Sequence, residues 1–263
     1  MLLTNKVVVV YGAGGAVGSV VARAFAGEGA RVFATGRRLE PVARVVNDIV
    51  RAGGVAEAAQ LNALDESGVA RHLDAVIAST GRVDVSFNAI GIPQQGIQGI
   101  PLTDLSVESF ALPVSTYATS QFITARAAAR RMAAQRSGVI LMHTPEPARL
   151  GAPLVGGMGP AWAAMEGLSR GFSAELAAAG VRAVVLRTTG LPETATIDVV
   201  FDLHAKAAGT TRQQFQSIVE GMTHRRQSTT LAELASVAAF VASDRASAMT
   251  GTVANLTGGA IVD

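Results

Sequence analysis

The chain has 263 residues, of which 49% are hydrophobic and 16% charged, a composition that suits one globular α/β domain and excludes a disordered chain. The absence of cysteine excludes a disulfide framework and thiol chemistry. Its 22 basic and 20 acidic side chains give a net charge of +2, and because the arginines are scattered, we do not expect nucleic acid as a partner.

The first half of the chain alternates short apolar runs with helical patterns. Val7–Tyr11 is a β-branched run that predicts a strand buried on both faces. Apolar residues at helical spacing from Val17 onward predict a helix after the glycines that follow this strand. Further strands are predicted at 30–36, 55–61 and 83–87, with helices around 39–49 and 69–77.

The second half continues the same alternation. A long helix is predicted at 107–135, before a strand at 138–142 and a loop at 143–157. A helix that ends at Leu176 follows this loop. Later strands are predicted at 181–186 and 251–256, the last one after an Ala-rich helix that begins with the capping box Thr230-x-x-Glu233.

The strand–helix alternation predicts a Rossmann-type, doubly wound parallel sheet of about seven strands with helices on both faces. We expect it to form a single domain spanning residues 1–263. Residues 188–227 interrupt the alternation after a strand end, where such sheets bind ligands, so we expect them to form a mobile lid. No stretch approaches the ~20 apolar residues that cross a bilayer, and we expect a cytoplasmic protein without a membrane partner.

The glycine-rich stretch YGAGGAVGS at 11–19 lies between the first strand and the first helix. Glycines in this position let the backbone approach a pyrophosphate, and the helix N-terminus supplies free N–H donors. The stretch therefore predicts a dinucleotide site. The residues concerned are Gly12, Gly14, Gly15, Val17 and Gly18.

The end of the second predicted strand indicates the type of cofactor. An acidic residue there would accept a hydrogen bond from the ribose 2′-hydroxyl of NAD(H). Gly36 occupies that place, and Arg37 and Arg38 follow it, with guanidinium groups that suit a 2′-phosphate. The sequence favours NADP(H) over NAD(H); the alternative is a pair of exposed arginines at a helix entry.

From end to end the motifs resemble those of the short-chain dehydrogenase/reductase family. The glycine turn is similar to the family's Thr-Gly-x-x-x-Gly-x-Gly, and FVASDRASAMTGTVANLTGG is similar to its final helix and strand. The resemblance implies a homo-oligomer, a dimer or a tetramer. It also adds residues to the cofactor site: Asn62 near the adenine, Asn88 and Gly91 in FNAIG, and Gly190 and Thr194 in TGLPET near the nicotinamide amide.

The resemblance locates a catalytic helix that lacks the family's catalytic side chains. Alignment of AAMEGLSRGFSAEL with the family's fifth helix puts Met158 at the position of the catalytic tyrosine and Trp162 at that of the lysine. We expect the indole of Trp162 to lie in the nucleotide cleft, at the nicotinamide position.

Three other residues are candidates for the catalytic roles. Thr144 lies at or beside the family's serine, and Tyr117 takes the place of its asparagine. His143 is the third, because histidine titrates near neutral pH. The alternatives are a structural histidine and a core aromatic residue. The remaining histidines are scattered, so no metal site is predicted.

Three functions remain open at this point. The first is an NADP(H)-dependent oxidoreductase with an atypical active site and a small apolar carbonyl or alcohol substrate. The second is a catalytically inactive nucleotide-binding or scaffold protein, and the third is a dehydratase or cyclase that uses His143. The substrate pocket is expected to be apolar, with Ile90, Ile92, Ile97, Ile100 and Leu154 nearby.

Overall fold

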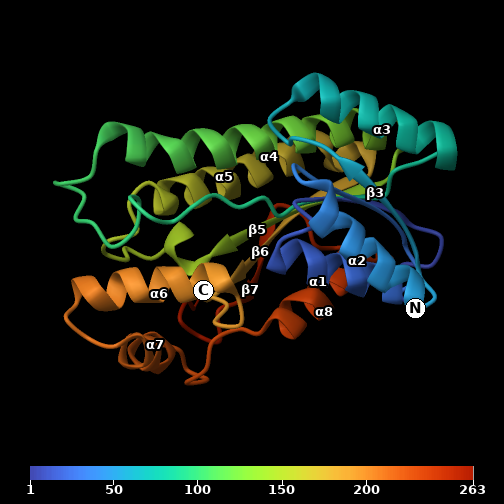
Figure 1. Ribbon diagram of the computed structural model, residues 1–263. Coiled ribbons are helices and arrows are strands. Elements are labelled where there is room, and N and C mark those ends of the chain that lie inside the picture. The colour runs from blue at the N-terminus through green and yellow to red at the C-terminus, as the bar shows by residue number, and fades with distance from the viewer. Residues whose placement is uncertain (263) are drawn as a thin grey trace.

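Seven parallel strands form one sheet in the computed structural model, which describes residues 1–262 (Figure 1). They are β1 (Val7–Tyr11), β2 (Arg31–Gly36), β3 (Val55–Gln60), β4 (Val85–Asn88), β5 (Gly138–Pro145), β6 (Val181–Thr188) and β7 (Thr252–Leu256). The strand order is β3-β2-β1-β4-β5-β6-β7, which confirms the predicted Rossmann-type fold. The order reverses between β1 and β4, the point at which such sheets bind ligands.

Two layers of helices cover the sheet. The helices are α1 (Ala16–Gly27), α2 (Leu39–Arg51), α3 (Glu66–Thr80), α4 (Val107–Gln135), α5 (Met158–Leu176), α6 (Ala195–Ala207), α7 (Arg212–Gly221) and α8 (Leu231–Ala242). One core cluster joins α1, α2 and α8 to the sheet, and a second joins α3, α4 and α5 to its other face (Figure 1). Among residues 1–262, no helix combines the length and hydropathy that a membrane span requires.

β5 and β6 are longer than their apolar runs predicted. Their parallel pairing continues to the end of both strands, with Thr144 opposite Arg187 and Pro145 opposite Thr188. His143 and Thr144 therefore belong to a strand and not to the loop expected from residue 143. The prediction was wrong because polar residues at the end of a strand carry no apolar signal, whereas pairing with β6 satisfies their backbone groups.

The segment expected to form a lid contains α6 and α7. Phe201 of α6 packs edge to face against Phe215 of α7, with ring centroids 5.5 Å apart. α6 also lies against the loop that follows β4, because a Cβ at Gly99 would lie 3.0 Å from the carbonyl oxygen of Leu203. Residues 188–227 thus pack against the loop after β4, next to the point where the strand order reverses.

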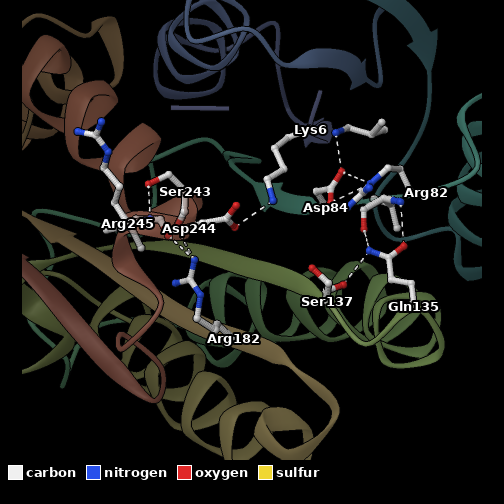
Figure 2. A network of polar contacts seen from close by, with 12 residues as sticks. Lys6, Arg82, Asp84, Gln135, Ser137, Arg182, Ser243, Asp244 and Arg245 are labelled. Carbon is white, nitrogen blue, oxygen red and sulfur yellow. Dashed lines mark hydrogen bonds and ion pairs between the residues drawn. The ribbon is translucent and has the colours of Figure 1, made fainter. Parts of the chain in front are cut away.

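Ion pairs and hydrogen bonds hold the amino ends of the strands together (Figure 2). Asp84 precedes β4 and is only 3% exposed. Its carboxylate accepts from the backbone N–H of Val7 at 2.8 Å and from Nε of Arg82 at 2.8 Å. Lys6 Nζ lies 2.9 Å from Asp244 Oδ1. The starts of β1 and β4 are thereby tied to each other and to the segment after α8.

Arg182, near the start of β6, fastens the end of α8 in the same region (Figure 2). Its guanidinium donates to three backbone carbonyls, those of Val241, Ser243 and Met249, at 2.9 to 3.1 Å. The last carbonyls of a helix have no partner within the helix. Arg182 supplies that partner here, so its charge has a structural use.

Candidate functional site

A cleft of about 520 Å³ lies at the carboxyl ends of β1, β2 and β4. It is lined by the glycine turn after β1, the β2–α2 connection and the loops after β3 and β4. Seven of the predicted cofactor residues meet there: Gly12, Gly14, Gly15, Arg37, Arg38, Asn62 and Gly91.

The glycine turn is shaped by close backbone approaches. Gly12 has a φ of +72°, and a Cβ there would lie 2.7 Å from the carbonyl oxygen of Ala89. A Cβ at Gly14 would lie 2.8 Å from Cβ of Pro41. Gly18 is buried beneath the turn, where a Cβ would overlap the carbonyl of Gly12. Glycine is required at these positions to keep the cradle open, which fits a bound pyrophosphate.

The two arginines of the β2–α2 connection give the cleft a positive end. Arg37 and Arg38 are exposed, and Arg38 is the N-cap residue of α2. Within residues 1–262, neither guanidinium takes part in an ion pair, and no acidic side chain lines the cleft. The cleft therefore leaves two cationic groups free beside the place where a dinucleotide ribose would lie.

A second cavity, of about 200 Å³, continues from the cleft and shares Gly15, Ala89, Ile90 and Gly91 with it. α4, α5, β5 and the β6–α6 connection enclose it. The predicted residues in its wall are Val17, Asn88, Tyr117, His143, Trp162, Gly190 and Thr194. Val17 and Trp162 therefore face the same space, although they lie 145 positions apart in the sequence.

Two side chains on the first turn of α5 were aligned with the family's catalytic tyrosine and lysine. One of them lies in the wall of this cavity and the other lies in the core. Trp162 is half-buried and lines the cavity. Met158 is fully buried in the core cluster between α5 and the sheet. α5 begins after Gly157, where a Cβ would overlap the carbonyl of Phe110 on α4. This close packing of α4 on α5 fixes where the indole lies.

His143 and Tyr117 both lie in the wall in uncharged form. His143 Nε2 lies 2.9 Å from the hydroxyl oxygen of Thr188, and burial lowers the pKa of its imidazole to about 4. Burial raises the pKa of the Tyr117 phenol to about 12. Both shifts disfavour the charged form. Neither group readily exchanges a proton at neutral pH.

Thr144 does not reach the cavity. Successive side chains of a strand point to opposite faces, and here His143 and Pro145 face the cavity. Thr144 is fully buried on the other face, and its hydroxyl donates to Glu166 Oε1 at 3.0 Å. Glu166 also pairs with Arg187, at 2.8 Å and 2.7 Å. The expected position of Thr144 beside the family's serine thus does not bring its hydroxyl into the site.

A family model described as enoyl-(acyl carrier protein) reductase matches residues 12–260. The chain belongs to the short-chain dehydrogenase/reductase family. It is 28% identical to the uncharacterized oxidoreductase YxbG of Bacillus subtilis, over 98% of this chain and 91% of that protein. It is 27% identical to the 3-oxoacyl-[acyl-carrier-protein] reductase FabG of Escherichia coli, over 98% of both chains.

The structures of this oxidoreductase family have the same fold. NAD⁺-bound xylitol dehydrogenase superposes with a TM-score of 0.92 at 24% identity, covering 98% of this chain and 100% of that one. Membership implies that the protein uses NAD(P) as its cofactor. The glycine cradle and the continuous cleft and cavity fit such a group.

Glu146 is a titratable residue next to the cavity wall that the sequence analysis missed, although it does not itself line the cavity. It follows Pro145, which lines the cavity, directly in the chain. Burial raises the pKa of its carboxyl to about 7, and in the described chain its Oε2 atom has no partner. The signal available in the sequence was an acidic residue just after an apolar strand, in HTPEP.

Polar side chains also line the pocket that was expected to be apolar. Gln94, Gln98 and Gln121 are buried in its wall, beside apolar residues such as Ile90 and Val200. Of the apolar residues expected nearby, Ile90 lines this cavity and Ile92 lines only the cleft, whereas the expectation was wrong for Ile97, Ile100 and Leu154, which line neither. The loop after β4 turns Gln94 and Gln98, four residues apart, toward the cavity and buries Ile97 beneath them.

Proposed function

We propose that the protein is an NADP(H)-binding oxidoreductase with an atypical active site, in which Met158 and Trp162 occupy the family's tyrosine and lysine positions. Its substrate is a small, largely apolar carbonyl or alcohol compound. The observation that carries the cofactor preference is the arginine pair, Arg37 and Arg38, which among residues 1–262 has no acidic partner and lies in a cleft wall without an acidic side chain. Guanidinium groups bind phosphate by charge-assisted hydrogen bonds.

Different parts of the wall hold different parts of the cofactor in this proposal. The backbone at Gly12, Gly14 and Gly15 binds the pyrophosphate, and Asn62 lies near the adenine. Asn88, Gly91, Gly190 and Thr194 surround the nicotinamide end. NADPH supplies a hydride when it is bound. The chain itself binds and orients the substrate and excludes water from it.

This site differs from the usual site of the family mainly in proton transfer, because the tyrosine that exchanges the proton is replaced by Met158. A thioether has no exchangeable proton, and general acid–base catalysis typically contributes ~10²–10⁴-fold to the rate. His143 and Tyr117 are poor replacements because their pKa values lie near 4 and 12. Glu146, with a pKa of about 7, is better matched to neutral pH and directly follows Pro145 of the cavity wall, although its own side chain does not line the cavity. We expect slow turnover of ordinary ketones.

Two structural features complete the proposal. Residues 188–227 act as a lid on a single domain, because Thr194, Ile197 and Val200 contribute to the cavity wall. The chain forms a homo-oligomer through α4 and α5, where Phe122 is 42% exposed and stacks on Phe172. Val107, Phe110 and Leu112 of α4 are exposed as well, and several exposed apolar side chains on one helix favour an interface.

A catalytically inactive nucleotide-binding protein is the second candidate. It is favoured by the complete burial of Met158 in the core, because the side chain at the tyrosine position then does not line the cavity. This candidate shares the cofactor site and differs in turnover alone.

The test is a thermal shift measurement with NADPH and NADH, followed by a screen of ketones and alcohols. A hundredfold excess of NADPH over its Kd should stabilise the protein by roughly 2.7 kcal/mol. The fluorescence of Trp162, the only tryptophan, should also change. A shift with NADH alone would refute the NADP(H) preference. NADPH binding without any turnover would favour the inactive protein.

A further inference from the structure

Two glutamines of the loop after β4 belong to a buried chain of hydrogen bonds. Gln98 Nε2 donates to Gln94 Oε1 at 2.6 Å, and Gln94 Nε2 lies 2.7 Å from the carbonyl oxygen of Ile92. At the other end, Nε2 of His204 on α6 lies 3.1 Å from Gln98 Oε1. The side chains of Gln94, Gln98 and His204 are 5%, 3% and 8% exposed. The chain therefore joins the lid segment to the loop through the cavity wall.

The carbonyl of Ile92 fixes the direction of every bond in this chain. A carbonyl oxygen only accepts, so the amide nitrogen of Gln94 must face it. The oxygen of Gln94 then faces Gln98, which must donate with its own nitrogen. The oxygen of Gln98 in turn requires a proton on Nε2 of His204. The carbonyl of Ile92 therefore determines both the amide orientations of the two glutamines and the tautomer of the histidine, which are otherwise ambiguous.

This direction leaves the two amide nitrogens with unused donors. Each nitrogen carries two hydrogens, and the chain uses one of each. Within residues 1–262, neither nitrogen has a second acceptor. Gln94 and Gln98 both line the cavity. Leaving a buried donor without a partner costs free energy, so the wall is suited to a ligand atom that accepts.

The rest of the cavity is uncharged. Over the described residues, its wall contains no Asp, Glu, Lys or Arg side chain. His143 is neutral, and so is the amide of Gln121, whose nitrogen donates one of its two hydrogens to the backbone oxygen of Asn88 at 3.0 Å. A carboxylate or phosphate would lose its hydration here without gaining a counter-ion.

We propose that Gln94 and Gln98 form a donor pair that binds an uncharged carbonyl or hydroxyl oxygen of the substrate, so that both residues determine specificity. The inference rests on the proposed function in one respect, that this cavity is the substrate site. It restricts the substrate to small, uncharged oxygen compounds. Their hydrocarbon part lies against Ile197 and Val200 of the lid.

The experiment measures binding of three six-membered-ring probes to the full chain by saturation-transfer NMR. The probes are cyclohexanone, its hydrocarbon analogue methylenecyclohexane, and cyclohexanecarboxylate. We expect cyclohexanone to bind about tenfold more tightly than the hydrocarbon, because only the ketone pairs with the two donors. The carboxylate should bind more weakly than the ketone.

Three variants locate the preference. Gln94→Met and Gln98→Met keep the length of the side chain and remove the donors, so each should bring the ketone-to-hydrocarbon ratio close to one. Gln95→Met is the matched control, because Gln95 is exposed and does not line the cavity. It should keep the tenfold ratio.

The proposal of a donor pair is overturned by any of three results. The wild-type protein binds the ketone and the hydrocarbon equally, it prefers the carboxylate, or cyclohexanone does not bind at its solubility limit. It is also overturned if both Met variants keep the preference. The wild-type comparison decides even where a variant does not fold. A ketone preference without an NADPH thermal shift would refute the cofactor proposal alone, and the reverse result would refute the donor pair alone.

Discussion

The amino ends of the strands and their carboxyl ends, called here the amino edge and the carboxyl edge of the sheet, use their polar groups in opposite ways. At the amino edge, Asp84, Lys6 and Arg182 all have partners, which tie strand starts to one another and to the end of α8. At the carboxyl edge, Arg37 and Arg38 have no acidic partner in the described chain. The contrast indicates that the amino edge maintains the fold, whereas the carboxyl edge keeps groups available for a ligand.

One charged cluster near the carboxyl edge departs from this pattern. Glu166 and Arg187 form an ion pair with side chains only 7% and 3% exposed, and Thr144 donates to the same carboxylate. None of the three lines the cavity. This cluster therefore belongs to the structural part of the molecule, although it lies close to the site.

Glu166→Ala tests that assignment and should have the largest effect. It leaves the buried guanidinium of Arg187 without its counter-ion, and the free energy of unfolding should fall by about 3–5 kcal/mol. Urea denaturation measures it. The double variant Glu166→Leu/Arg187→Met removes both charges and should recover most of the loss. A loss below about 1 kcal/mol for the single variant would mean that the pair is not buried in solution.

The carboxyl edge should also show two opposing pH dependences. His143 has a pKa of about 4 against an ordinary 6.5. The unfolded state therefore binds a proton that the folded state rejects, and the free energy of unfolding decreases as the pH falls from 6.5 to 4. Glu146 has a pKa of about 7 against 4.5, so its contribution is lost as the pH rises from 4.5 to 7. Each amounts to about 3 kcal/mol at most.

The two dependences nearly cancel in the wild-type protein between pH 4.5 and 6.5. Glu146→Gln removes one of them, so the stability of this variant should rise with pH through that range. His143→Gln should produce the opposite slope. Urea denaturation at a series of pH values checks both, and parallel pH profiles for the two variants would contradict the assignment.

At the amino edge, Asp84→Asn should destabilise the protein by about 2 kcal/mol, because it removes a buried, charge-assisted acceptor. Asp244→Asn is the matched control: its side chain is 84% exposed, and the loss should stay below about 1 kcal/mol. Both variants should bind NADPH like the wild type. A change in cofactor affinity at Asp84→Asn would show that the two edges are coupled.

The smallest effect is expected for the cofactor arginines. Arg37→Ala and Arg38→Ala should each weaken NADPH binding about tenfold, or 1.4 kcal/mol, and leave NADH binding unchanged. Arg245→Ala, at the amino edge, is the control and should alter neither. Isothermal titration calorimetry measures all three, and equal losses for both cofactors would refute a 2′-phosphate site.

Local patterns in the sequence determined the fold and the outline of the cofactor site. The β-branched run Val7–Tyr11 predicted a buried strand, and alternating strand and helix patterns predicted the parallel sheet, both confirmed. The glycine turn predicted a cradle because glycine's lack of a Cβ acts through its immediate neighbours. Such features depend on residues close together in the chain, so they can be predicted without the tertiary structure.

The lining of the second cavity could not be predicted from the sequence, because it depends on contacts between distant parts of the chain. Pairing with β6 extended β5 and turned Thr144 away from the cavity. The acid Glu166 met Arg187 only when α5 packed on β6. The direction of the glutamine chain follows from Ile92 and from His204, which is 106 positions from Gln98. The pKa of Glu146 follows from burial. Pairing, burial and long-range hydrogen bonds are properties of the packed structure, and for this reason only the tertiary structure decided them.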